Sequence, residues 1–214
     1  VDPVKFTLYI YKGDKTGTVL SPDYLNDFIA ARIKKLRPKR IFIPDAEKHL
    51  AGLLNLIELN SSAEFTLTTQ LEKMQMLLSL VLSDCKGVTI QHGSPYFRGG
   101  SSQGYDYIYL LPPFGEMVEE PDSFLSKSSE GAVLESQLEG LNEMGALDAI
   151  VPAKVMFSGG LQRLRSYITD KYNLKSLFVL PEGVLRPTTA IKTYFISITS
   201  KPQTEVEIGS LGLK

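Results

Sequence analysis

The chain has 214 residues, of which 43% are hydrophobic and 22% are charged, a composition typical of one globular domain with a sizeable core. The formal net charge is −1 at pH 7, so the basic excess of proteins that bind nucleic acid unaided is absent, and any such contact must be local or shared with other domains. A single cysteine excludes an internal disulfide, and together with two histidines it leaves no plausible zinc cluster. No apolar run approaches the ~20 residues that span a membrane, and the start carries no signal-peptide pattern, so we expect a cytoplasmic protein with neither a metal nor a membrane partner. The sequence begins VDPVKF without methionine, and we expect it to be a fragment of a longer protein.

The first half of the chain alternates predicted strands with predicted helices. A strand over 4–11 precedes the turn-rich stretch GDKTG. A helix then begins with Ser21 as its N-cap and Pro22 in its first position, and it ends before Pro38. The elements that follow are a short buried strand at 41–44, a helix over 49–60, a strand over 63–68, a buried helix over 69–83, and strands over 87–91 and 105–111.

The second half begins with a polar, irregular stretch over 116–131 that is a candidate mobile loop. The predicted elements after it are a helix over 133–147, a strand over 149–155, a helix over 158–173, and strands over 174–181 and 190–200. The alternation predicts a parallel, doubly wound α/β sheet, in which ligands bind at the carboxyl ends of the strands. The predicted organisation is an N-terminal strand and turn segment (1–20), the main domain (21–202) and an extended, peripheral C-terminal tail (203–214).

The stretch YDYIYLLPPFG at 105–115 places an aromatic residue at such a strand end. Proline lacks an amide donor and cannot continue a central strand, so Pro112 and Pro113 end it and fix Phe114 at the edge of the sheet. A fixed aromatic ring can stack on a flat ligand such as an unstacked base. Taken alone, the stretch is more often only a strand terminator.

Several further segments, in the same order along the chain, resemble one protein family. YDYIYLLPPFG is similar to its FDxVLANPPFG, KTGTVLSPDYLNDFIA to its GxFxTPxxLxxxM, and IVPAKVMFSGG to its VPxGxLFxxG. The run from YNL through LPEGV to the two threonines at 188–189 matches the tail of the family nearly position for position. Over about residues 15–202 the chain therefore resembles the adenine-N6 DNA methyltransferases, most closely the modification subunit of type I restriction systems. The resemblance implies a class I S-adenosylmethionine-dependent methyltransferase (Rossmann-like) fold. In that fold the central sheet is mostly parallel, helices cover both faces, and the last strand is inserted antiparallel.

The resemblance also implies the chemistry of the family, which binds S-adenosylmethionine, flips an adenine out of the duplex and methylates its exocyclic nitrogen. In the family motif Asn-Pro-Pro-Phe, the asparagine and a neighbouring carbonyl hold the amino group while the aromatic ring stacks on the base. Here Pro112, Pro113 and Phe114 are kept, but Leu111 stands in place of the asparagine. Leucine offers no hydrogen bond to the target amine, and a desolvated polar group without a partner costs roughly 1–3 kcal/mol.

The turn after the strand at 41–44 departs further from the family. The family carries DPxCGSG there, because glycines let the backbone approach the cofactor. This chain has IPDAEKHLAG at 43–52, with Ile43 in place of the acidic residue. Glu47 and Lys48 stand in the glycine-serine region, and His49 takes the place of the second glycine. Side chains at these positions would crowd the methionine part of the cofactor.

Other cofactor positions are partly kept. One slip of register would bring Asp45 to the acidic position, and Glu64 is expected toward the ribose hydroxyls. Gly93 is present without the aspartate that faces the adenine of the cofactor in the family. The candidate cofactor residues that the resemblance implies are Ser21, Pro22, Pro44, Asp45, Glu64 and Gly93.

Together these departures favour a domain of a restriction-modification or defence protein that has kept the scaffold and lost the chemistry, and that holds partner subunits or positions DNA. Two alternatives stay open: an active adenine-N6 DNA methyltransferase, and a protein-interaction module on the same scaffold. The basic run ARIKKLRPKR at 31–40 could contact phosphate, although a solvated surface is the more common explanation.

Overall fold

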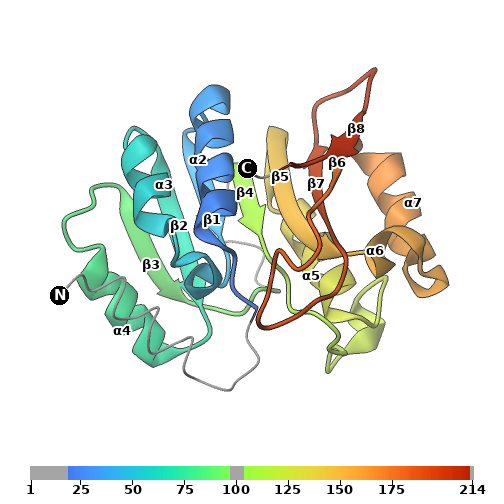
Figure 1. Cartoon of the computed structure of the whole chain (residues 1–214), viewed down its shortest axis with the longest axis horizontal. Helices are drawn as coiled ribbons and strands as arrows, with labels where there is room; N and C mark the ends of the chain where they lie inside the picture. The colour runs from blue at the N-terminus through green and yellow to red at the C-terminus, as the bar shows by residue number, and fades with distance from the viewer. Residues whose placement is uncertain (1–18, 97–103, 213–214) are drawn as a thin grey trace.

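The computed structural model describes residues 19–96 and 104–212, which form one mixed sheet covered by helices (Figure 1). The predicted strand over 4–11 lies outside these residues. The eight strands are ordered β3-β2-β1-β4-β5-β7-β6-β8 across the sheet. Their bounds are β1 (Arg40–Ile43), β2 (Glu64–Thr69), β3 (Val88–His92), β4 (Tyr105–Leu110), β5 (Leu141–Pro152), β6 (Asn173–Val179), β7 (Thr193–Thr199) and β8 (Glu207–Ser210).

The pairing of the strands confirms the expected mostly parallel sheet. The five strands from β3 to β5 are parallel to their neighbours. β7 pairs antiparallel with both β5 and β6, which is the inserted antiparallel strand that the resemblance implied. The C-terminal tail contributes β8, which pairs parallel with β6 at the edge of the sheet.

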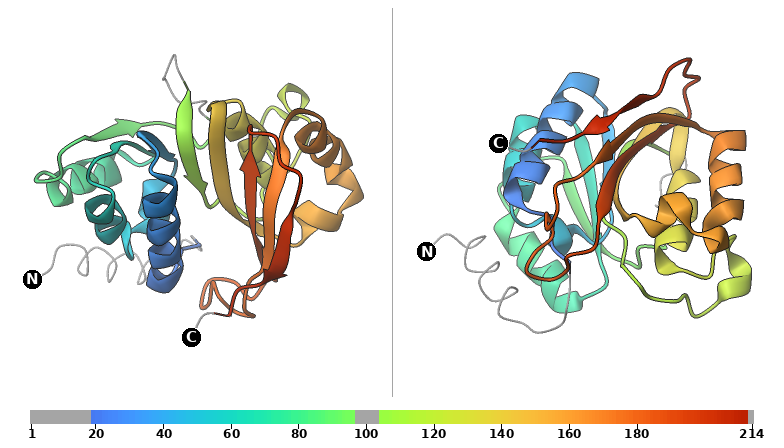
Figure 2. Two further views of the ribbon diagram at one scale, coloured as in Figure 1. Left: turned by 90° about the horizontal axis from the view of Figure 1, so that it is seen from above. Right: turned by 45° about the vertical axis from the view of Figure 1, so that its right-hand side comes forward.

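Helices cover both faces of the sheet, so the core has two layers (Figure 2). One cluster of buried side chains joins the sheet to α2, α3 and α4, and the other joins it to α5 and α7. The central strands β1, β4 and β7 are buried along nearly their whole length, whereas the edge strands β3 and β8 are largely exposed. The helix bounds are α2 (Asp23–Leu36), α3 (Leu53–Leu59), α4 (Glu72–Val81), α5 (Ser129–Leu138), α6 (Lys154–Phe157) and α7 (Gln162–Lys171), with short 3₁₀ turns at η1 (Ala46–His49), η2 (Pro121–Ser123) and η3 (Gly159–Leu161).

The predicted helix over 133–147 is wrong in its second half. α5 ends at Leu138, and the chain enters β5 at Leu141. Gly145 shows why the second half must be a strand: a Cβ there would lie 2.8 Å from the backbone oxygen of Tyr105, so the glycine permits the close approach of β5 to β4. The predicted strand over 149–155 ends earlier than expected, at Pro152, and the short helix α6 follows.

Among the described residues, no helix is both long enough and apolar enough to cross a membrane. Within the same residues, histidine, cysteine and carboxylate side chains do not gather in a group that could hold a metal ion.

Candidate functional site

The carboxyl ends of β1 to β4 meet at one edge of the sheet, where the fold places most of the predicted site residues. Pro44 and Asp45 follow β1, Gly93 follows β3 and Leu111 follows β4. Backbone hydrogen bonds tie this edge together: the amide of Gly93 donates to the carbonyl of Thr69, and the amide of Ser21 donates to the carbonyl of Lys48. The structure therefore gathers these segments as parallel strand order requires.

Glu64 is the exception among the predicted residues. It is the first residue of β2 and is exposed at the amino edge of the sheet, in register with Arg40. It therefore lies at the opposite edge from Asp45, and its carboxylate does not come to the site. The position that follows β2 is Gln70, whose side-chain amide donates to Asp45 Oδ1 at 3.2 Å. The prediction failed because the acid begins the strand instead of ending it.

The turn after β1 is packed with charged side chains. Asp45 adopts a left-handed conformation (φ 48°), which aspartate tolerates better than most residues, and η1 follows it directly. Glu47, Lys48 and His49 are 4%, 8% and 0% exposed. Charged residues are buried this deeply almost only when they are paired, and the three side chains differ in the partners that they find.

Lys48 is the best satisfied of the three. Its ammonium donates to Asp45 Oδ2 at 2.7 Å and to the backbone carbonyl of Leu111 at 3.1 Å. The second bond joins the turn after β1 to the residue that precedes the double proline. The ammonium of Lys48 thus lies against the end of β4, at the segment where the family motif holds its target amine.

His49 lies fully buried behind this ion pair. Its ring is 4.1 Å from the ring of Tyr109, and neither ring nitrogen has a hydrogen-bond partner among the described residues. Burial, together with the nearby charge of Lys48, lowers the pKa of His49 to about 3. The imidazole is therefore neutral at physiological pH and acts as an apolar filler.

Glu47 faces the other side of the turn, toward β2. The hydroxyl of Thr69 donates to its carboxylate, but Oε2 has no partner among the described residues. Burial and the charge of Asp45 raise the pKa of Glu47 to about 7. Near neutral pH this carboxyl group therefore takes up a proton that an exposed glutamate would release.

A buried hydrogen-bond network connects Ser21 to the same turn. The hydroxyls of Ser21 and Tyr109 both donate to Asn26 Oδ1, at 2.9 and 3.0 Å, and the Asn26 amide donates to the carbonyls of His49 and Ala51. Ser21 consequently does not cap α2, which begins at Asp23 after Pro22 without a side-chain cap. The predicted N-cap was wrong because the Ser21 hydroxyl is committed to this network.

The segment after β4 is held rigidly, but not as an open platform. Alternation along β4 places Leu111 on the same face as Tyr109, and Leu111 is fully buried in the cluster that includes α2 and α3. Phe114 is half-buried and packs against that cluster. From α5, the Ser129 hydroxyl donates to the Pro113 carbonyl at 3.2 Å, and Glu130 Oε1 accepts the amide of Gly115 at 2.6 Å.

The residues of this edge do not fit S-adenosylmethionine in the manner of the family. The family approaches its cofactor with bare backbone, whereas here three buried side chains stand at the equivalent turn. Gly52, the nearest glycine, serves packing instead: a Cβ there would lie 2.9 Å from Asn26 Cβ, so it permits the close approach of α3 to α2. The carbonyl of Leu111 is already occupied by Lys48. The sequence indicated the lost glycines, but it gave no sign that their replacements form a buried plug that is held by the ion pair between Lys48 and Asp45.

The sheet order, the inserted antiparallel strand and the position of the site define the fold of the class I S-adenosylmethionine-dependent methyltransferases. A putative member from Listeria monocytogenes superposes with a TM-score of 0.75 at 16% identity, covering 94% of this chain and 68% of that one. The modification subunit of a putative type I restriction enzyme from Vibrio vulnificus superposes with a TM-score of 0.73 at 18% identity, covering 94% of this chain and 48% of that one.

Sequence comparison gives the more particular likeness. The chain is 28% identical over 129 residues to the methylase subunit of the type I restriction enzyme EcoEI from Escherichia coli, covering 56% of this chain and 26% of that protein. No protein-family model matches. The resemblance to type I modification subunits is thus confirmed in sequence and in fold, and the chain has the fold of the class I methyltransferases. It spans about a quarter of the length of this curated relative and about half of the solved modification subunit.

Proposed function

We propose that this chain is a catalytically inactive methyltransferase-fold domain of a cytoplasmic restriction-modification type protein, in which it holds partner subunits or helps to position DNA. The observation that carries the proposal is the plug formed by Glu47, Lys48 and His49, which stand buried where the family has its glycine-rich turn. We refer to these three residues as the turn plug.

The turn plug supports the loss of cofactor binding on energetic grounds. A bound S-adenosylmethionine would have to displace the ion pair between Lys48 and Asp45 and move two further buried side chains. Breaking a buried ion pair without replacing its partner costs roughly 3–5 kcal/mol. A penalty of that size weakens binding by about two to four orders of magnitude.

The base-binding end supports the same conclusion independently. Leu111 offers no polar atom from its side chain, and its carbonyl already accepts a bond from Lys48. A target amine would therefore lack the side-chain partner that the family motif provides, and it would share the Leu111 carbonyl with Lys48. Since the reaction depends on holding that nitrogen in line with the methyl group, the loss of orientation alone removes much of the rate.

The comparisons support the partners that we propose. One of the solved structures similar to this chain is described as showing complex assembly and conformational transition of a type I restriction-modification system, with a TM-score of 0.65. A scaffold that keeps this fold can keep the surfaces for subunits and DNA after its own site has closed. The role proposed here is thus structural within such an assembly.

Methyl transfer to DNA from labelled S-adenosylmethionine tests the proposal. We expect no transfer by the wild type, and none by Leu111→Asn, because the turn plug remains. The informative variant combines Leu111→Asn with Glu47→Gly, Lys48→Ser and His49→Gly, which restores the asparagine and the glycine-serine-glycine run of the family while Ile43 stays in place of its acidic residue.

The binding of labelled S-adenosylmethionine is measured for each variant alongside methyl transfer. If the combined variant binds the cofactor while the wild type does not, the turn plug is the cause of the lost cofactor binding. Methyl transfer by the wild type or by Leu111→Asn alone would contradict the proposal and support the alternative of an active adenine-N6 DNA methyltransferase.

A further inference from the structure

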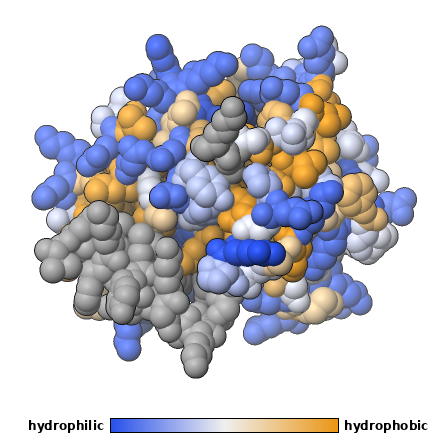
Figure 3. Space-filling model, viewed as in Figure 1, coloured by the Kyte–Doolittle hydropathy of each residue, from blue (hydrophilic) through white to orange (hydrophobic). Residues whose placement is uncertain are grey.

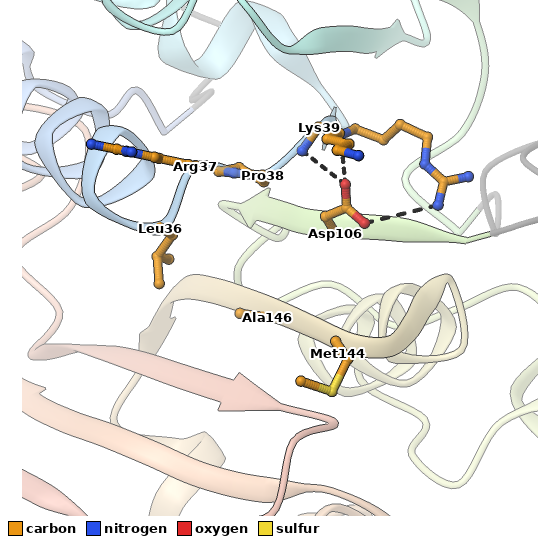
Figure 4. Close-up of a pocket in the computed structure, with 8 residues that line it drawn as sticks. Leu36, Arg37, Pro38, Lys39, Asp106, Met144 and Ala146 are labelled. Atoms are coloured by element: carbon orange, nitrogen blue, oxygen red, sulfur yellow. Dashed lines mark hydrogen bonds and ion pairs between the residues drawn. The ribbon is translucent and has the colours of Figure 1, made fainter.

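A surface groove lies at the amino edge of the sheet, opposite the turn plug. Its volume is about 590 Å³, and it runs between the end of α2 and the first half of β5 (Figure 4). The segment Arg37-Pro38-Lys39 lies along one side, and Met144 and Ala146 lie opposite (Figure 4). Leu36 and Met144 are 40% and 64% exposed, so the groove is open to solvent.

The carboxylate in the groove is fully occupied. Asp106 Oδ2 accepts the backbone amides of Lys39 and Arg40, both at 2.8 Å. Asp106 Oδ1 accepts a hydrogen bond from the side chain of Asn142 and lies 3.8 Å from the Arg40 guanidinium. Asp106 therefore fixes the backbone of the basic segment and has little capacity left to neutralise other cations.

Two cations that line the groove, and two more in the last turn of α2, have no such partner. Within 19–96 and 104–212, no hydrogen bond or ion pair engages the side chains of Lys34, Lys35, Arg37 or Lys39. In the space-filling view, hydrophilic side chains of either charge lie along the upper part of the face shown (Figure 3). The exposed carboxylates of Glu64 and Glu143 lie at the same edge of the sheet as the four cations, so the local charge is positive although the net charge of the whole chain is −1.

The helix end accounts for only part of this charge. Cations in the last turn are favoured by the negative carbonyl end of a helix, which explains Lys34 and Lys35. It does not explain Arg37, whose φ of 53° puts it in the left-handed conformation where glycine is preferred. Nor does it explain Lys39, which lies beyond the helix after Pro38.

We propose that this groove binds the phosphate backbone of a DNA duplex, with Arg37 and Lys39 contacting phosphates and the apolar wall of Leu36 and Met144 lying against the sugars. A row of unpaired cations on a fixed backbone segment suits a repeating anion. Such contacts hold a duplex in register without reading its sequence. The inference rests on the DNA-positioning role in the proposed function, but the groove is at the opposite edge from the turn plug, so its failure would leave the proposed loss of cofactor binding untouched.

The test is fluorescence anisotropy of a labelled duplex of about 20 base pairs with the 214-residue chain, over a series of salt concentrations. We expect the double variant Arg37→Gly/Lys39→Ser to bind more weakly and to lower the slope of log K against log salt by about 1.8, since each phosphate contact contributes about 0.9. Arg37→Gly places glycine at a left-handed position, so its melting temperature should equal or exceed that of the wild type.

A matched control removes the same charge elsewhere. Lys73→Ser/Arg163→Ser replaces two exposed cations on α4 and α7 and should leave both affinity and slope near the wild-type values. The inference is overturned if the double variant keeps the wild-type slope, if the control loses as much, or if the wild type shows no salt-dependent binding. If the protein binds poly-glutamate but not DNA, the groove is a site for an acidic protein, and the proposal of DNA binding is overturned as well.

Discussion

Replacing His49 with phenylalanine should make the stability of the protein respond differently to pH. In the wild type the folded-state pKa of His49 is depressed from 6.5 to about 3, because the ring is buried. A group whose pKa is depressed by folding contributes stability that is present above its unfolded pKa and is lost as the pH falls. His49 therefore destabilises the fold progressively below pH 6.5.

Glu47 works in the opposite direction over nearly the same range. Folding raises its pKa from 4.5 to about 7, so the folded state binds the proton more tightly than the unfolded chain does. Its contribution is fully present below pH 4.5 and is lost as the pH rises to 7. As the pH falls from 6.5 to 4.5, His49 lowers the free energy of unfolding while Glu47 raises it by a similar amount. The two contributions cancel, so together these groups leave the stability nearly constant over this range.

The size of the effect follows from the slopes. Each group alone changes the free energy of unfolding by at most about 1.4 kcal/mol per pH unit, and by less close to its pKa values, so over the two units of this range each accounts for about 2 kcal/mol. His49→Phe should gain that amount of stability relative to the wild type on going from pH 6.5 to pH 4.5. Glu47→Gln should lose a similar amount over the same interval.

Urea denaturation followed by circular dichroism, at half-unit steps of pH, measures these differences. The comparison uses only how the free energy of unfolding changes with pH. A constant loss of stability from altered packing in either variant therefore does not affect it. The double variant should restore a curve parallel to that of the wild type. If His49→Phe and Glu47→Gln both run parallel to the wild type between pH 4.5 and pH 6.5, the two groups are not buried as described and the reasoning is refuted.

Three further perturbations test other parts of the structure. Asp148→Asn should cost about 3–5 kcal/mol in urea denaturation, because it leaves the guanidinium of Arg32 without its 2.8 Å partner in a buried ion pair; an unchanged unfolding midpoint would contradict this. Glu130→Gln should speed hydrogen exchange at the amide of Gly115, which donates to the Glu130 carboxylate, whereas an unchanged rate would show that this bond does not hold the turn. Lys48→Met should destabilise the fold by about 3–5 kcal/mol, because Asp45 then stays buried without a counter-ion, and a variant as stable as the wild type would remove the plug as a structural element.

The sheet could be predicted from the sequence because its central strands are apolar on both faces and its strands and helices follow one another in a recognisable order. The failure at 140–147 has a physical cause. The stretch LNEMGAL has enough apolar residues at helical spacing to continue α5, and only the approach of β5 to β4 at Gly145 requires an extended chain there. Tertiary contact overrides local preference at such a place.

The position of the site was also predictable, since the double proline marks the end of β4 and parallel strands bring their carboxyl ends together. The side chains that fill the site, and their pairing, could not be predicted. Lys48 has a polar sequence context and would ordinarily be exposed, and its bond to the carbonyl of Leu111 joins residues 63 apart in the chain. Nothing in a linear pattern indicates a pairing over that distance, so the departure from glycine was visible but the plug was not.

The ion pair between Arg32 and Asp148 was missed for the same reason. Arg32 belongs to the basic run that we took as a solvated surface, yet its guanidinium lies 5.0 Å from the ring centroid of Phe195 and bonds to a fully buried aspartate. Within that run, one arginine joins α2 to the sheet while others remain at the surface. Periodicity could assign the helix, but not the role of each cation on it.

Calorimetric titration of the folded chain with S-adenosylmethionine and S-adenosylhomocysteine tests the central claim most directly. We expect no heat of binding at millimolar ligand, because three buried side chains stand where the family has its glycine-rich turn. Micromolar binding of either ligand would contradict it, since the buried Asp45–Lys48 pair would then have to open at little cost, and the chain would have to be treated as an enzyme.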